Sequence, residues 1–93
     1  MALDGKLENG YVEHLRNVRN LSENSIRAYV ADLESMITHV NQMGITDFST
    51  LELNHLRSWL SNLQVRGGAR SSISRRVVSI RAFTYWAAQN GWL

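Results

Sequence analysis

Four arginines and four serines lie between residues 70 and 81, and no acidic residue accompanies them. A guanidinium group can donate two parallel hydrogen bonds to a phosphate or to the O6 and N7 atoms of guanine. Serine hydroxyls are further donors to phosphate oxygens. These residue types, repeated along one segment, indicate that the segment binds an anion such as nucleic acid. A solvated basic helix face is the alternative that the residues alone leave open.

The charges of the chain are divided unevenly along its length. The 93 residues carry a formal net charge of +2. Residues 66–93 hold five arginines and no acid, which gives +5, whereas the first 65 residues hold five basic and eight acidic groups, which gives −3. An asymmetry of this kind favours an anionic partner for the C-terminal part.

Other site chemistries lack the residues that they require. The chain has no cysteine, which excludes disulfides, thiolate metal sites and cysteine nucleophiles. Its three histidines have no paired-ligand spacing, and no glycine-rich phosphate loop is present. We therefore predict no metal, no cofactor, no catalytic site and no small-molecule substrate. The absence of a long apolar run and of a signal peptide predicts a cytoplasmic protein without membrane contact.

Amphipathic helices are expected to position these groups, because apolar residues recur every three or four positions and no segment alternates as a strand does. The expected helices cover residues 5–18, 23–42, 50–64 and 72–89. Candidate N-terminal caps are Ser22, Ser49 with Glu52, and Ser71. The short connections predict that consecutive helices are neighbours. The expected fold class is all-α, a compact four-helix bundle in which residues 1–93 form one domain.

A helical projection separates an inner and an outer face on the segment 72–89. The inner face is apolar and consists of Ile73, Val77, Ile80, Phe83 and Ala87. Arg75 and Ser79 are expected almost opposite this face, and Arg76 at its edge. Ser71 and Ser72 are expected beside the free N–H groups of the N-terminal end. The outward residues of the second helix repeat the pattern more weakly, and they include Asn24, Ser25, Arg27, Ala28 and Ala31.

Two of these segments resemble the N-terminal core-binding domain of tyrosine recombinases, most closely that of Xer-type recombinases and phage integrases. Residues 21–29, LSENSIRAY, followed by Asp32 and Leu33, resemble its second helix. Residues 72–77, SISRRV, followed by residues 80–83, IRAF, resemble its fourth helix. The likeness covers nearly the whole chain, and the two motifs stand in the order that the family has.

The resemblance implies a SAM-like orthogonal bundle of crossed helical hairpins that forms one jaw of a clamp around double-stranded DNA. It implies that the second and fourth helices face the major groove of a recombination half-site. The DNA contacts that it implies are Asn24, Ser25, Arg27, Ala28, Ser71, Ser72, Arg75, Arg76 and Ser79. It further implies that surfaces near the first helix touch other recombinase protomers in a tetrameric synapse.

The resemblance also implies that the chain is not itself an enzyme. In the family, an arginine, lysine and histidine cluster around a nucleophilic tyrosine belongs to a C-terminal domain, whereas this chain stops at Leu93. We therefore expect a non-catalytic DNA-binding fragment of a recombinase that acts in DNA recombination and integration.

The chief alternative is a helical protein–protein interaction module. Trp59, Trp86 and Trp92 could form an exposed partner surface, although Trp86 could instead close the domain against the first helix. A helix-turn-helix repressor is less favoured, because a second helix of about 20 residues is roughly 30 Å long, and such motifs pair shorter helices.

Overall fold

The computed structural model describes residues 5–67 and 69–93, and every regular element in them is a helix. The elements are α1 (Gly5–Asn17), α2 (Glu23–Gln42), the 3-10 helix η1 (Phe48–Thr50), α3 (Leu53–Val65) and α4 (Arg70–Gln89). The predicted all-α class is confirmed, and α2 spans the predicted residues. Gly68, which the predicted turn before the last helix includes, lies outside the described residues. None of the described helices is long and apolar enough to cross a bilayer.

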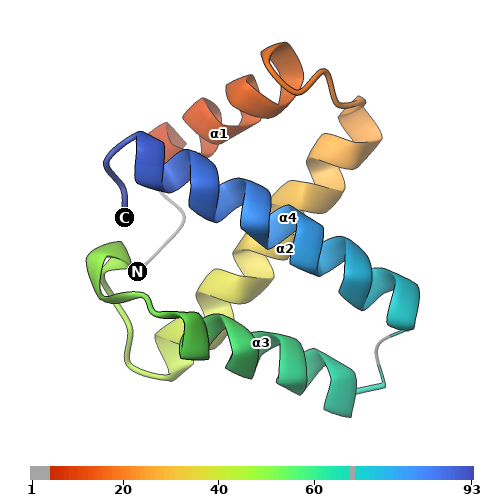
Figure 1. Cartoon of the computed structure of the whole chain (residues 1–93), viewed down its shortest axis with the longest axis vertical. Coiled ribbons are helices and arrows are strands. Elements are labelled where there is room, and N and C mark those ends of the chain that lie inside the picture. Colours follow the sequence, from red (N-terminus) through yellow and green to blue (C-terminus); the bar gives the residue numbers. More distant parts are fainter. Residues whose placement is uncertain (1–4, 68) are drawn as a thin grey trace.

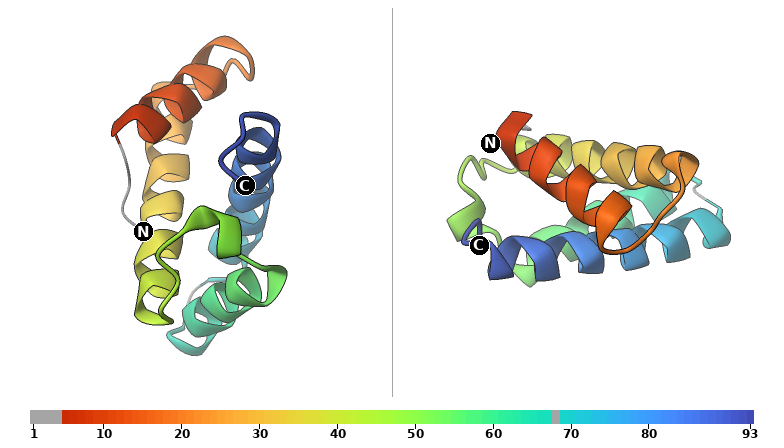
Figure 2. Two further views of the ribbon diagram at one scale, coloured as in Figure 1. Left: turned by 90° about the vertical axis from the view of Figure 1, so that its left-hand side faces the viewer. Right: turned by 90° about the horizontal axis from the view of Figure 1, so that it is seen from above.

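The two longest helices, α2 and α4, have 20 residues each and cross near their middles (Figure 1). The shorter helices lie at opposite ends of this crossing, with α1 beside the first half of α2 and α3 beside its second half. Seen from above, α2 and α4 occupy two layers (Figure 2). The crossed helical bundle expected from the sequence is therefore confirmed, and it brings the first turns of α2 and α4 to the same side of the molecule.

One apolar core fills the space between the helices, and aromatic rings form one end of it. The rings of Tyr11, Phe83 and Trp86 pack with centroids 5.3 to 6.3 Å apart. Gly10 lies against the indole of Trp86, and a Cβ atom added at Gly10 would come within 3.2 Å of that ring. Trp86 therefore closes the domain against α1, which is one of its two predicted roles.

The tryptophans do not form the exposed surface that the interaction-module alternative requires. Trp59 and Trp86 are buried, and the indole N–H of Trp59 donates to Ser35 Oγ at 3.0 Å. Trp92 is half-buried against the same core. The indole rings thus hold the domain together. The prediction of an exposed tryptophan surface is wrong, because large apolar rings gain the most free energy by leaving water.

The predicted cap of α2 is confirmed, and the predicted cap of the third helix is wrong. Ser22 Oγ accepts a hydrogen bond from the backbone N–H of Ser25 at 3.2 Å. Asp47, however, accepts from the N–H of Ser49 at 2.9 Å and starts η1, so that α3 begins only at Leu53. A carboxylate two residues upstream was the stronger local acceptor, and it diverted the chain into a separate turn.

Ser71 does not cap α4. The helix begins at Arg70, after Ala69, and its start has no side-chain cap. Gly67 has φ +85°, so the chain reverses in the left-handed region just after α3 and re-enters helical geometry before Ser71. Ser71 therefore belongs to the first turn of α4, where its hydroxyl is exposed.

Candidate nucleic-acid interface

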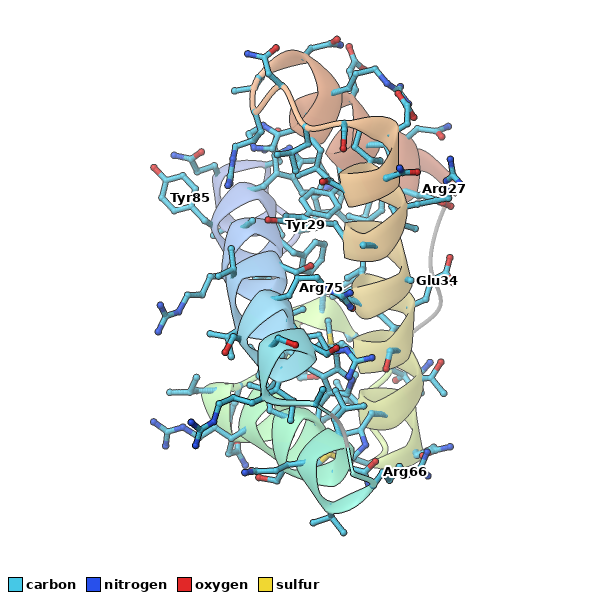
Figure 3. All side chains as sticks on the ribbon, turned by 90° about the vertical axis from the view of Figure 1, so that its right-hand side faces the viewer. Arg27, Tyr29, Glu34, Arg66, Arg75 and Tyr85 are labelled. Atoms are coloured by element: carbon cyan, nitrogen blue, oxygen red, sulfur yellow. The ribbon has the colours of Figure 1, made fainter. Side chains whose placement is uncertain are left out.

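The first two turns of α2 carry four of the nine residues that the sequence analysis assigned to DNA. Asn24 and Arg27 are exposed, whereas Ser25 and Ala28 are half-buried. The hydroxyl of Ser25 accepts a hydrogen bond from Ser22 Oγ at 3.1 Å. Arg27 lies near the start of the helix, on the flank of α2 away from Arg75 (Figure 3), and it lines the groove between α1 and α2 beside Glu23 and Glu34. This part of the face is therefore available to a ligand chiefly through Asn24 and Arg27.

The first two turns of α4 carry four more, on the same side of the molecule (Figure 1). Ser71 is exposed and Ser72 is half-buried. One turn further along, the side chains of Arg75 and Arg76 are 43% and 24% exposed. The bundle thus brings hydroxyl and guanidinium groups of two helices, far apart in the sequence, to one side of the crossing.

A buried carboxylate joins these two arginines to α2. Asp32 is only 2% exposed, and its Oδ1 atom accepts a hydrogen bond from Arg75 Nη2 at 2.7 Å. Arg75 Nε lies 3.3 Å from Asp32 Oδ2, and Arg76 Nε lies 3.3 Å from Asp32 Oδ1. The segment 70–81 holds no acid of its own, but Arg75 and Arg76 are paired with an acid from another helix.

The sequence contained a signal for this ion pair that a count of charges overlooks. Asp32 lies directly before Leu33 and one turn before Met36, and both of these neighbours are buried. A carboxylate on the buried side of a helix requires a cation, because an unpaired buried charge is strongly destabilising. The arginines of α4 supply the cations that Asp32 requires.

Ser79 does not lie on the outer face, where the helical projection placed it. It is 2% exposed, and its carbonyl oxygen accepts a hydrogen bond from Tyr11 Oη at 3.4 Å. Of the projected inner face, Ile80, Phe83 and Ala87 are buried, whereas Ile73 and Val77 are only half-buried. The buried face also includes Ser79 and Ala82. Ser79 therefore offers no surface to DNA in this conformation.

Three further arginines extend the positive charge beyond the crossing. Arg66 and Arg70 are exposed at the end of α3 and the start of α4, and Figure 3 shows Arg66 at the far end of this side. Arg81 is exposed as well, but it lines the grooves that α4 forms with α1 and with α3. Neither groove includes a residue of α2, so Arg81 lies on a different flank of α4 from Arg75.

The arrangement suits recognition by hydrogen bonds and charge. Burial raises the pKa of Tyr11, so its phenol stays protonated at neutral pH and donates to the backbone of Ser79. Within residues 5–67 and 69–93, no three histidine, aspartate or glutamate side chains gather where they could hold a metal ion. Besides the exposed carboxylate of Glu23, which pairs with Arg16, this side presents guanidinium, amide and hydroxyl donors, and these bind phosphates and base edges.

The fold and this donor-rich side define a small all-helical domain with a basic crossing of two long helices. The profile of the phage integrase N-terminal SAM-like domain family matches residues 9–91. The chain belongs to this family. The recombinase resemblance noted from its second and fourth helices is thereby confirmed at the level of the family.

The chain is also similar to several bacterial proteins named tyrosine recombinase XerC. It is 38% identical over 88 residues to that of Bifidobacterium longum (strain DJO10A), a match that covers 95% of this chain and 24% of the relative. Over 81 residues it is 41% identical to that of Mycobacterium leprae (strain TN) and 31% identical to that of Pseudomonas putida, covering 87% of this chain and 27% of each relative. The chain therefore spans about a quarter of the length of these relatives. No solved structure matches it.

Proposed function

We propose that this chain binds duplex DNA at a recombination half-site, as the N-terminal part of a site-specific tyrosine recombinase. Membership of the integrase family and similarity to proteins named tyrosine recombinase support the proposal. The strand-cleaving chemistry would reside elsewhere in the recombinase, and this chain would act by binding alone.

One observation carries the proposal: the first turns of α2 and α4 lie on the same side of the molecule and offer donors there. Arg27 is exposed on α2, and Arg75 and Arg76 lie at the crossing. The major groove of B-DNA admits an α-helix, and cationic side chains on both flanks can reach the phosphates. Asn24 on α2 and Ser71 on α4 add donors for phosphate or base edges.

The proposal extends to partners of the whole recombinase. We propose that other recombinase protomers contact the domain in a tetrameric complex on DNA. An exposed groove between the end of α1 and α4, which includes Val18, Val78 and Tyr85, is an apolar surface that such a contact could cover. Sedimentation of the complete recombinase with DNA, with and without Tyr85→Glu, tests this part; an unchanged assembly would contradict the use of this groove.

A titration of the chain into a fluorescently labelled duplex tests DNA binding. The duplex would carry a candidate half-site, and a scrambled duplex would serve for comparison. If three to five phosphates are contacted, log K should fall with log salt at a slope of roughly −3 to −4.5. An absence of binding at low salt, or binding that does not respond to salt, would contradict the proposal.

Paired variants test which side of the molecule binds. Arg27→Ala removes a cation from the proposed face, and Arg57→Ala removes one from the groove between α3 and α4. The net charge changes equally in both, so long-range attraction is lowered equally. We expect Arg27→Ala to weaken binding several-fold more than Arg57→Ala; equal losses would contradict the assignment of the face.

A further inference from the structure

Arg75 and Arg76 are adjacent in a helix, yet their side chains meet at one atom. Adjacent residues of an α-helix project about 100° apart, so their side chains do not face one another. Arg75 Nη2 and Arg76 Nε nevertheless lie 2.7 and 3.3 Å from the same atom, Asp32 Oδ1. A carboxylate on α2, and not the geometry of α4, therefore sets the direction of both arginines.

The contacts with Asp32 use one edge of each guanidinium group. Arg75 donates through Nε and Nη2, and Arg76 donates through Nε. An arginine carries its N–H donors in a planar fork with more than one usable edge. Nη1 of Arg75 and both Nη atoms of Arg76 therefore remain for a second acceptor on the solvent side.

The cluster combines an excess of positive charge with restricted motion. Two cations share one anion, and the anion is 2% exposed while the cations retain 43% and 24% exposure. The positive charge thus faces solvent, and the negative charge lies behind it. Long side chains that are already held in place lose less conformational entropy when a ligand binds.

We infer that Asp32 is a positioning residue for DNA: it holds Arg75 and Arg76 as a preformed pair that binds the oxygens of a backbone phosphate. The inference rests on the proposed DNA binding and adds to it a residue that never touches the ligand. The inference fixes the direction in which DNA affinity changes. Removal of this acidic residue weakens binding to a polyanion, although it makes the domain more positive.

The first test is Asp32→Asn, which keeps the shape of the side chain and removes its charge. With the pair no longer anchored, we expect DNA binding to weaken about tenfold on half-site and scrambled duplex alike, because a phosphate contact is lost. If Asp32 acted only as a competing anion, the same change would tighten binding. The two ideas therefore differ in the direction of the measured shift.

Glu34→Gln is the matched control. Glu34 is an exposed acid on the same helix, and in Figure 3 it lies on the side of α2 away from Arg75. Its removal changes the net charge by the same amount without touching Arg75 or Arg76, although Glu34 lines the same groove as Arg27. We expect Glu34→Gln to bind DNA at least as tightly as the wild type. Asp32→Asn binding as tightly as Glu34→Gln would overturn the inference.

A second variant tests the inference if Asp32→Asn does not fold, as judged by circular dichroism. Arg75→Lys keeps the charge beside an intact Asp32 but lacks the fork that faces carboxylate and phosphate together. We expect Arg75→Lys to lose nearly as much affinity as Arg75→Ala. Retention of wild-type affinity by Arg75→Lys would overturn the inference.

The wild-type titration separates this inference from the proposed function. A wild-type chain that fails to bind duplex DNA at low salt overturns both. A wild-type chain that binds with the expected salt dependence, while Asp32→Asn or Arg75→Lys binds equally well, overturns only the role of Asp32.

Discussion

The two halves of α4 are held to the rest of the domain by different forces. In the C-terminal half, Phe83 and Trp86 pack with Tyr11 of α1 in a cluster from which water is excluded. In the N-terminal half, Ile73 and Val77 are only half-buried, Val78 is exposed, and the main polar contact is the ion pair of Arg75 with Asp32. One helix therefore joins an aromatic end to a charged crossing.

This difference separates stability from recognition along a single helix. Large apolar rings gain free energy by leaving water, and a site filled in this way has no room for a ligand. Cations at a partly exposed crossing add less stability but keep donors that an anion can reach. Substitutions at the aromatic end should therefore alter the free energy of unfolding. Substitutions at the charged crossing should alter both the free energy of unfolding and the affinity for DNA.

The largest effect is expected at the aromatic end. Trp86→Ala should lower the free energy of unfolding by about 3–5 kcal/mol, because a buried indole is replaced by a cavity. Urea denaturation followed by circular dichroism measures the loss. The neighbouring Tyr85 is 67% exposed, so Tyr85→Ala should change stability by no more than about 0.5 kcal/mol. Similar losses in the two variants would break the distinction between the halves.

Asp32→Ala should have the next largest effect on stability. Removing one partner of a fully buried ion pair costs about 3–5 kcal/mol. Here both arginines reach water and can be solvated after the change, so we expect a loss of about 1–3 kcal/mol by the same denaturation assay. A variant as stable as the wild type would show that the charged crossing contributes nothing to the fold.

The two arginines should differ from one another. Arg75 makes the shorter contact and reaches both carboxylate oxygens, whereas Arg76 makes one contact at 3.3 Å. Arg75→Ala should therefore cost about 1–2 kcal/mol of stability and Arg76→Ala less than about 1 kcal/mol. Both should weaken DNA binding several-fold in the duplex titration. A larger stability loss for Arg76→Ala would reverse the assigned geometry.

The smallest effect concerns an exposed ion pair far from both halves of α4. Arg16 donates to Glu23 at 2.8 and 3.0 Å, and this hydrogen bonding lowers the pKa of Glu23 below its ordinary value of 4.5. A lowered acid pKa stabilises the folded state above the ordinary value, and this contribution disappears as the pH falls through the pKa. The small difference in Tm between wild type and Glu23→Gln should therefore shrink on acidification. A difference that persists in strong acid would contradict the assignment.

The parts of the fold that depend on neighbouring residues were predictable. Periodicity located every α-helix, and the Ser22 cap fixed the start of α2, because these signals act within one or two turns. The start of α3 was missed, since the carboxylate of Asp47 competed with the predicted box. Local rules give no ranking when two acceptors a few residues apart can each serve the same N–H groups.

The parts of the site that depend on distant pairs were less predictable. The exposure of Arg75 followed from helical geometry, but the burial of Ser79 depends on how α4 packs against the neighbouring helices. The partner of Arg75 lies 43 residues away, and a charge count within one segment cannot find it. The position of Asp32 on the buried side of α2, where a carboxylate requires a cation, was the sequence signal for this pairing.

The uncapped start of α4 should affect how fast its backbone amides exchange with solvent. Its first N–H groups receive no side-chain acceptor from Ala69, and the flanking residues are exposed. Amides there should exchange with deuterium through brief fraying of one turn, while those beside Phe83 and Trp86 should exchange only when the aromatic end opens. Exchange rates should therefore fall steeply from the beginning to the end of a single helix, so that the end proposed to meet DNA is also the end that remains free to adjust to it.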